Sequence, residues 1–258
     1  MKRMDSFEEL VCNAERQPFQ GWDFSYLHGR YEQGRPDWDY RELVLEGLRN
    51  VASLLDLGTG GGEFLSSLGR LPETACATEG YKPNTRVALA NLRSSGVDVV
   101  ETWCEDNGTE AQAGALPFRD ETFDLVIDRH ESYVPGEVLR VLKRKGRFIT
   151  QQVGSGNNSE LRLLFKSAES HTYRNLSEAK DELEAAGFVV RERGELSVKS
   201  RFLDVGALVY YLKAIPWEVP GFSVYRFGRE LREAHSMILR HGSVDVTTAR
   251  FYVVASKV

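Results

Sequence analysis

A strand, a glycine turn and a helix follow one another near residue 55, and this run constrains the fold more than any other feature. Apolar residues surround Asp56 over 51–57, and Gly58, Gly60 and Gly62 follow at alternate positions. Residues 64–68 then have the composition of a short helix. A strand that passes through glycines into a helix brings bare backbone N–H groups and a helix N-terminus together. The run therefore predicts a ligand site where the first strand ends.

The glycine spacing also indicates which class of ligand the turn accepts. Dinucleotide-binding folds use the spacing G-x-G-x-x-G beside a pyrophosphate. This chain has G-x-G-x-G, and Glu63 stands where the third glycine would be. Because an anionic side chain is unsuited to a diphosphate, we expect a nucleoside with a zwitterionic tail. A nicotinamide-dependent dehydrogenase is the weaker alternative.

Length and charge narrow the classes of protein and partner. The 258 residues suffice for one domain with an appended subregion. An apolar content of 41% and a charged content of 28% are typical of a soluble globular protein. The net charge of −5 disfavours nucleic acid as a partner, because that binding depends on lysine and arginine contacts to phosphates.

The cysteines and the hydropathy of the chain indicate the cellular compartment in which the protein is expected. The three cysteines, Cys12, Cys76 and Cys104, form no C-x-x-C pair, and their odd number argues against a disulfide framework. No run approaches the ~18 apolar residues that span a bilayer, and no apolar signal core follows the N-terminus. These features predict a cytoplasmic protein without membrane contact.

Short apolar strands alternate with helices along the rest of the chain. Strands are expected at 51–57, 74–79, 97–103, 122–128, 146–153, 188–193 and 248–256. Helices are expected at 61–70, 83–95, 135–143, 177–186, 204–214 and 225–241. This rhythm predicts an α/β fold, with a mostly parallel sheet covered by helices on both faces. We expect residues 1–50 to form a helical cap of the same domain, and residues 51–258 to carry an insertion around 200–245.

Polar residues follow three of the expected strands, at the edge where ligands bind in open α/β sheets. Glu79 ends the second strand, and a carboxylate there can accept hydrogen bonds from both hydroxyls of a ribose. Gln112 and Ala113 follow the third strand and can read the edge of an adenine. A surface turn with a buried Leu-Pro-Phe plug is the alternative interpretation of that segment. Glu79 is thus the expected ribose ligand.

The fourth strand ends in the polar run 128–133, DRHESY. His130 is the best candidate base, since its ordinary pKa lies near neutrality, and Glu131 is the alternative. A structural histidine with satisfied hydrogen bonds is the competing interpretation. We therefore expect the reacting end of the ligand to face this run.

These segments together resemble a known family. The runs LLDLGTGGGEF, ATEGY, LPFRDETFDLVIDRHESY and EVLRVLKRKGRFITQQV resemble the class I S-adenosylmethionine-dependent methyltransferases, and most closely the type 11 subgroup. The resemblance covers residues 50–153. It implies a Rossmann-like sheet of seven strands in the order 3-2-1-4-5-7-6, with the last strand antiparallel.

The resemblance also assigns roles in binding S-adenosylmethionine. Asp56 would order the loop and the methionine amine, the three glycines would contact the cofactor through their backbone, and Glu79 would hold the ribose. Tyr81 would cover the adenosine, and Arg129 and His130 would lie near the methyl group. The implied cofactor-binding residues are Asp56, Gly58, Gly60, Gly62, Glu79, Tyr81, Gln112, Ala113 and Arg129.

The resulting hypothesis is methyl transfer from S-adenosylmethionine to an oxygen, nitrogen or carbon of a small organic acceptor, without a metal. Such a transfer needs a base, His130 or Glu131, only when the acceptor must lose a proton. Aromatic residues are expected to form a lid over the acceptor: Trp22, Phe24, Tyr26, Trp38, Tyr40, Tyr210, Tyr211, Trp217, Phe222 and Tyr225.

Two other functions remain open. An RNA base methyltransferase would need a basic stripe, and the only dense basic cluster is Lys143, Arg144, Lys145 and Arg147. A protein that binds S-adenosylmethionine without catalysis would need a pocket closed above the sulfonium. The acidic composition favours a small-molecule acceptor over RNA.

Overall fold

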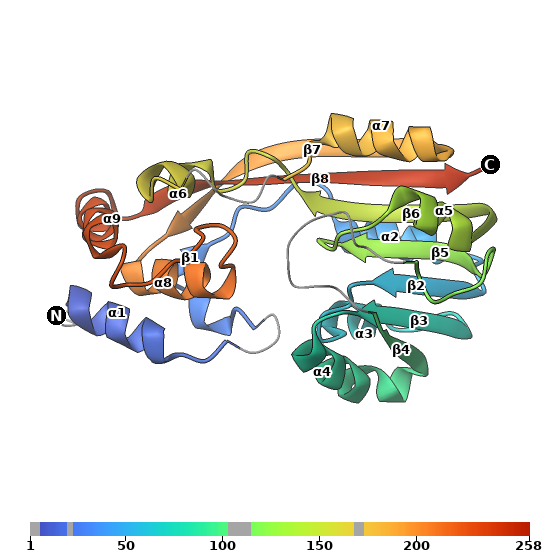
Figure 1. The fold of residues 1–258 in the computed structure, drawn as a ribbon, viewed down its shortest axis with the longest axis horizontal. Coiled ribbons are helices and arrows are strands. Elements are labelled where there is room, and N and C mark those ends of the chain that lie inside the picture. Colours follow the sequence, from blue (N-terminus) through green and yellow to red (C-terminus); the bar gives the residue numbers. More distant parts are fainter. Residues whose placement is uncertain (1–5, 20–22, 103–114, 168–172) are drawn as a thin grey trace. The chain divides into compact units, whose positions relative to one another are not determined.

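A computed structural model describes residues 6–19, 23–102, 115–167 and 173–258 (Figure 1). The chain forms two compact units. The sheet unit comprises 37–154, 174–195 and 250–258. The helical unit comprises 1–36, 155–173 and 196–249. Two long strands, β7 (Phe188–Phe202) and β8 (Val244–Lys257), contribute residues to both units.

The strand order confirms the expected topology. The sheet runs β1-β7-β8-β6-β5-β2-β3-β4, as Figure 1 allows the reader to follow. Its other strands are β1 (Tyr31–Glu32), β2 (Ser53–Leu57), β3 (Thr74–Glu79), β4 (Val97–Glu101), β5 (Phe123–Arg129) and β6 (Leu142–Val153). β2 pairs in parallel with β3 and β5, and β8 runs antiparallel to β6. The eighth strand is β1, whose two residues pair with the end of β7.

Helices cover both faces of the sheet, as the continuous apolar strands predict. All five residues of β2 are buried, and successive side chains point to opposite faces. Leu54 packs in one cluster with α2 (Tyr40–Gly47), α3 (Glu63–Ser67) and α4 (Lys82–Leu92). Leu55 packs in the other cluster, with α5 (Pro135–Val141) and α7 (Leu176–Ala186). The strand ends that form the candidate site thus project from a core buried on both sides.

One boundary between the two units falls at Pro36/Asp37. The reason is that α2 is part of the sheet unit. The Tyr40 hydroxyl donates to the carbonyl of Asp128 at 2.8 Å and accepts from its N–H at 3.2 Å. Tyr40 therefore joins the first residues of α2 to the end of β5.

The helical unit draws on several separate parts of the chain. It includes 155–173, with the short helix α6 (Ser159–Leu164), and β7 continues nine residues beyond the expected end at 193. Its other helices are α1 (Phe7–Arg16), the 3-10 turn η1 (Ser25–Leu27), α8 (Val205–Ala214) and α9 (Gly228–His241). Within the described ranges, none of the helices combines the length and apolar character that crossing a bilayer requires.

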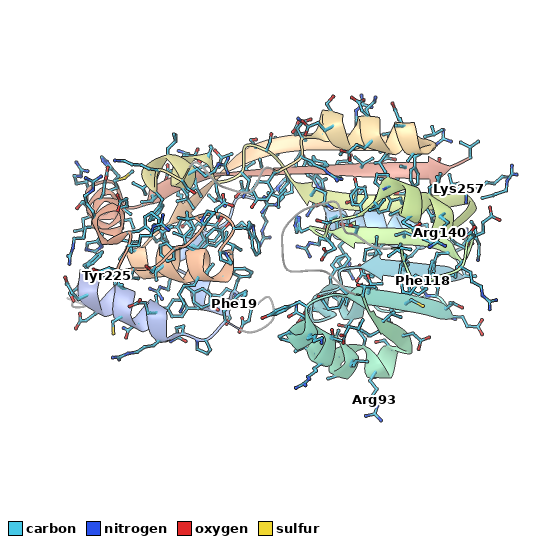
Figure 2. The ribbon with its side chains drawn as sticks, in the orientation of Figure 1. Phe19, Arg93, Phe118, Arg140, Tyr225 and Lys257 are labelled. Atoms are coloured by element: carbon cyan, nitrogen blue, oxygen red, sulfur yellow. The ribbon has the colours of Figure 1, made fainter. Side chains whose placement is uncertain are left out.

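Most of the expected lid aromatics that the structure describes pack inside the helical unit. Tyr26 and Tyr210 lie 4.8 Å apart between ring centroids, and Phe24 contacts Tyr211. Tyr225 and Trp217 are exceptions, since they are 99% and 39% exposed; Figure 2 labels Tyr225. Trp38 and Tyr40 belong to the sheet unit, and Trp22 lies outside the described residues. Their role as a lid stays a prediction.

Candidate active site

The glycine turn after β2 has the backbone conformation that its sequence predicts. Gly58, Gly60 and Gly62 have φ values of 60°, 63° and 81°, a region that side chains disfavour. The turn is fastened to β3, since the N–H of Thr59 donates to the carbonyl of Thr78 at 2.9 Å. Gly62 is the N-cap of α3 and has the left-handed conformation, so α3 begins directly after the turn.

Gly58 also makes room for a neighbouring strand end. A Cβ at this position would stand 2.5 Å from Cγ of Glu131 and 2.6 Å from its Cβ. Real atoms do not approach so closely, so a side chain at Gly58 would displace Glu131. The expected cofactor loop and the expected catalytic run after β5 therefore meet at these two residues.

Glu79 lies at the end of β3, beside the same turn. It is buried, and its carboxylate accepts a hydrogen bond from the N–H of Tyr81 at 2.8 Å. Burial raises the pKa of Glu79, while the N–H groups of Tyr81 and Gly60 favour its charged form. The Tyr81 side chain is 57% exposed. The structure thus places this acceptor of hydrogen bonds against the glycine turn.

Asp56 adds a second buried carboxylate, one residue before the end of β2. Burial and the nearby charge of Glu79 raise the pKa of Asp56 to about 7, against the opposing effect of Arg129. The pKa of Asp56 thus depends on the charges of Glu79, at the end of β3, and of Arg129, at the end of β5. A positively charged ligand group beside it would favour its ionised form.

A third buried carboxylate, Asp128, was not among the predicted site residues. The amide nitrogen of Gln152 donates to its Oδ1 at 2.7 Å and to the carbonyl of Glu131 at 3.0 Å. Burial, and then the charge of Glu131, raise the pKa of Asp128 well above its usual range. Partial burial and the charge of Glu79 also raise the pKa of Glu131. Four acidic side chains therefore influence one another around the glycine turn, an arrangement that favours a cationic ligand.

His130 has a left-handed backbone with φ of 69°, and its N–H donates to the carbonyl of Gln151 at 2.9 Å. Desolvation by surrounding protein and the positive charges of Arg250 and Arg129 lower the pKa of His130 well below its usual range. The residue still keeps an exposed surface, so the two charges act on a ring that solvent can reach. These surroundings therefore favour the neutral form of His130.

Gln151, which the sequence did not indicate, and Trp38, which was expected only as a lid aromatic, lie behind this histidine. The amide nitrogen of Gln151 is 3.4 Å from Nε2 of His130. The indole N–H of Trp38 donates to the amide oxygen of Gln151 at 2.9 Å. The polar pair Gln151 and Gln152, which closely follows the apolar residues Phe148 and Ile149 of β6, is the sequence signal that could have identified Gln151.

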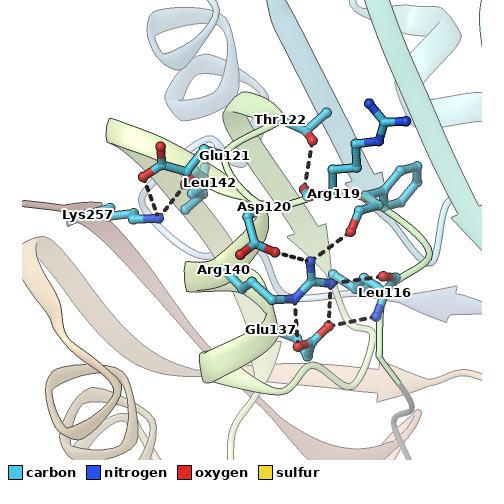
Figure 3. A network of polar contacts seen from close by, with 10 residues as sticks. Leu116, Arg119, Asp120, Glu121, Thr122, Glu137, Arg140, Leu142 and Lys257 are labelled. Atoms are coloured by element: carbon cyan, nitrogen blue, oxygen red, sulfur yellow. Dashed lines mark hydrogen bonds and ion pairs between the residues drawn. The ribbon is translucent and has the colours of Figure 1, made fainter.

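The segment before β5 is held by Arg140 of α5 (Figure 3). Its guanidinium donates to the carbonyls of Phe118 and Leu116 at 2.7 and 2.9 Å. Glu137 and Asp120 pair with the same guanidinium. Leu116 and Phe118 pack against the core, as the plug interpretation predicted. The expected adenine contacts, Gln112 and Ala113, lie outside the described residues.

Two residues of the basic cluster make polar contacts within the sheet unit. Lys143 pairs with Asp124 at 3.1 Å, and Arg147 donates to the carbonyl of Gly47 at 2.7 Å. Arg144 and Lys145 are exposed. Two of the four cations therefore stabilise the sheet unit, and the cluster offers less charge to a nucleic acid than its sequence suggests.

Comparison with known proteins agrees with this geometry. A family model described as a methyltransferase domain matches residues 55–150. A malonyl-[acyl-carrier protein] O-methyltransferase from Methylococcus capsulatus is 28% identical over 194 residues. That match covers 67% of this chain and 66% of the relative, just under two thirds of its length.

Solved structures share the fold at low sequence identity. A candidate methyltransferase from Bacillus halodurans C-125 matches with a TM-score of 0.60 and 17% identity, over 85% of this chain and 98% of its own. The YcgJ protein from Bacillus subtilis matches with a TM-score of 0.55 and 17% identity, over 84% and 97%. The matched residues 55–150 contain the end of β2, the glycine turn, Glu79 and the run after β5. Residues 55–150 are thus similar to a methyltransferase domain.

Proposed function

We propose that this protein transfers the methyl group of S-adenosylmethionine to an oxygen of a small organic acceptor. The observation that supports it most is the meeting of the glycine turn, Glu79 and a group of buried carboxylates at one edge of the sheet. The oxygen acceptor is supported by the relative from Methylococcus capsulatus, whose name describes an O-methyltransferase.

The residues at this edge fit S-adenosylmethionine in charge and in hydrogen-bonding groups. Its sulfonium and ammonium groups are cationic, and the carboxylates of Asp56, Glu131 and Asp128 have pKa values raised by burial and mutual repulsion. Glu79 would accept from the ribose hydroxyls, and the glycine backbone would contact the amino-acid tail. Tyr81 and Arg129 would border the adenosine and the methyl group.

When bound, S-adenosylmethionine supplies an electrophilic methyl carbon on a sulfonium. This chain's own residues would orient the acceptor and keep water away from it, which is the main requirement of an in-line transfer. His130 and Glu131 would meet the acceptor, because they follow β5 beside Gly58. Gln112 and Ala113 remain the proposed adenine contacts.

Labelled cofactor tests this function. The protein is incubated with methyl-labelled S-adenosylmethionine and a metabolite extract, and the masses of labelled products are measured. A labelled small molecule that depends on the protein is expected. Cofactor that binds but is never consumed would instead indicate a binding protein without catalysis. Label that appears only in RNA would move the acceptor to a nucleic acid.

A further inference from the structure

Three side chains of the sheet unit form a hydrogen-bonded chain that ends on His130. Trp38 donates its indole N–H to Oε1 of Gln151 at 2.9 Å, and Nε2 of Gln151 lies 3.4 Å from Nε2 of His130. The Trp38 ring also packs on Tyr252, with ring centroids 5.0 Å apart. Gln151 itself is buried. The position of the amide is therefore fixed from both sides.

The donor and acceptor roles in this hydrogen-bonded series follow from the chemistry of the indole, the amide and the imidazole. An indole nitrogen can only donate, so the amide atom that faces Trp38 must be the oxygen. The amide nitrogen then faces His130, and an amide nitrogen also only donates. Nε2 of His130 must therefore accept, which requires that it carry no proton. In a neutral imidazole the proton is then on Nδ1.

The surroundings keep the ring neutral and leave the other nitrogen accessible. Desolvation, Arg250 and Arg129 all lower the pKa of His130, so the doubly protonated ring is disfavoured at pH 7. In the part of the chain that the structure describes, no hydrogen bond to Nδ1 is present, and the residue is exposed. An Nδ1–H group is thus available to a ligand.

We propose that Trp38 and Gln151 hold His130 as the Nδ1–H tautomer, so that His130 donates a hydrogen bond to the methyl acceptor and takes no proton from it. This inference rests on the proposed function, and it makes Trp38 and Gln151 positioning residues. It also replaces the base that the sequence suggested at His130, because the lone pair of Nε2 is occupied by Gln151.

The tautomer restricts the class of acceptor. A hydroxyl must lose a proton as it is methylated, whereas a carboxylate already carries the electron pair that forms the new bond. With a carboxylate, one oxygen bonds to the methyl carbon, the carbon–sulfur bond breaks with its electron pair passing to sulfur, and no proton moves. A donor at Nδ1 fits an anionic oxygen. The acceptor class that needs neither His130 nor Glu131 as a base is a carboxylic acid, and its product is a methyl ester.

Nitrogen NMR reads the tautomer without any ligand. The full chain is labelled with ¹⁵N-histidine, and long-range proton–nitrogen spectra are recorded at pH 7, with His130 assigned by the loss of its signals in His130→Asn. We expect a protonated-type shift for Nδ1 and an unprotonated-type shift for Nε2. The other four histidines serve as the internal reference. A proton on Nε2 in the natural protein would overturn the inference.

Two substitutions each alter one hydrogen bond in the series Trp38–Gln151–His130. Trp38→Phe keeps the ring against Tyr252 but removes the N–H, so the amide can rotate and an Nε2–H population should appear. Gln151→Glu places an acceptor beside Nε2, which should move the proton there and raise the pKa of His130 by about one unit. The charged groups that this change meets are Arg129 and Arg250. Spectra unchanged in both variants would contradict the role of Trp38 and Gln151.

Kinetics separate positioning from simple structural support. At pH 8, Gln151→Glu should lower kcat about 10- to 100-fold, the value of one hydrogen bond to a charged group, with the affinity for S-adenosylmethionine unchanged. Lowering the pH should restore activity, because the doubly protonated ring regains Nδ1–H. A loss of kcat that is equal at all pH values would indicate structural damage and overturn the positioning role.

Product chemistry tests the acceptor class separately. Methyl esters release labelled methanol in alkali, whereas methyl ethers and amines do not, so alkaline release is expected. A product stable to alkali would overturn the carboxylate assignment while leaving methyl transfer intact. If S-adenosylmethionine fails to bind at all, the proposed function fails, whatever tautomer the spectra show.

Discussion

Gly58 and Glu131 are so close that no side chain fits at position 58: a Cβ there would stand 2.5 Å from Cγ of Glu131. The two residues lie 73 positions apart, at the ends of the parallel neighbours β2 and β5. Their contact joins the loop proposed to hold the cofactor to the run proposed to meet the acceptor. A change at Gly58 therefore affects both proposed subsites.

Gly58→Ala should weaken the binding of S-adenosylmethionine at least about tenfold, equivalent to ~1.4 kcal/mol, as measured by calorimetry. The added methyl group displaces Glu131, and the positive φ costs a further ~1–2 kcal/mol of stability. Gly69→Ala is the matched control, since Gly69 has φ of 84° with nothing within 4 Å of its Cβ position. It should lose stability alone. Equal affinities in the two variants would contradict the role of Gly58.

Glu79→Gln should lower the affinity for S-adenosylmethionine about 10- to 100-fold, because one charge-assisted acceptor of the ribose hydroxyls is removed. Glu73 lies just before the opposite end of β3 and is exposed, so Glu73→Gln removes the same charge away from the site. Calorimetry measures the affinity of both variants for S-adenosylmethionine. Similar affinities would show that Glu79 does not touch the ribose.

Asp56 should make the free protein less stable as the pH rises. Its pKa is raised to about 7 by burial, so the folded state binds a proton that the unfolded state has already released above pH 4. Its contribution to stability is present below about pH 4 and is lost as the pH rises toward 7. Urea unfolding at pH 5 and pH 8 should therefore show a smaller decline for Asp56→Asn than for the natural protein. An unchanged decline would contradict this assignment.

Arg140→Ala should destabilise the segment 116–120. The guanidinium donates to two backbone carbonyls and to Asp120 there, and to Glu137 of its own helix. Such bonds contribute about 1.5–3 kcal/mol each before solvent screening. The side chain is 27% exposed, so we expect a total loss of about 1–3 kcal/mol in urea unfolding. Arg144→Ala, at an exposed position nearby in sequence, should change stability by less than about 0.5 kcal/mol. Equal losses would contradict the anchoring role of Arg140.

Local patterns explain why much of the fold could be predicted. The apolar run of β2, the glycines after it and Glu79 at the end of β3 each carry their signal within a few residues. The strand order required the family resemblance in addition. β1 was missed because two residues give no periodicity, and its partner Phe202 is 171 positions away.

The site was less predictable because its polar contacts are made between distant strand ends. Trp38 and Gln151 are separated by 113 positions, and neither belongs to a local motif. Asp128 was seen in the polar run after β5, but its complete burial depends on Tyr40 and Gln152 from other elements. The hydrogen bond from Tyr40 to the end of β5 likewise spans 88 positions.

Titration of the purified protein with S-adenosylmethionine and with NAD in a calorimeter tests the central claim most directly. S-adenosylmethionine should bind to one site, with affinity lowered in Glu79→Gln and in Gly58→Ala, and NAD should give no heat. Binding of NAD with no response to S-adenosylmethionine would contradict the claim.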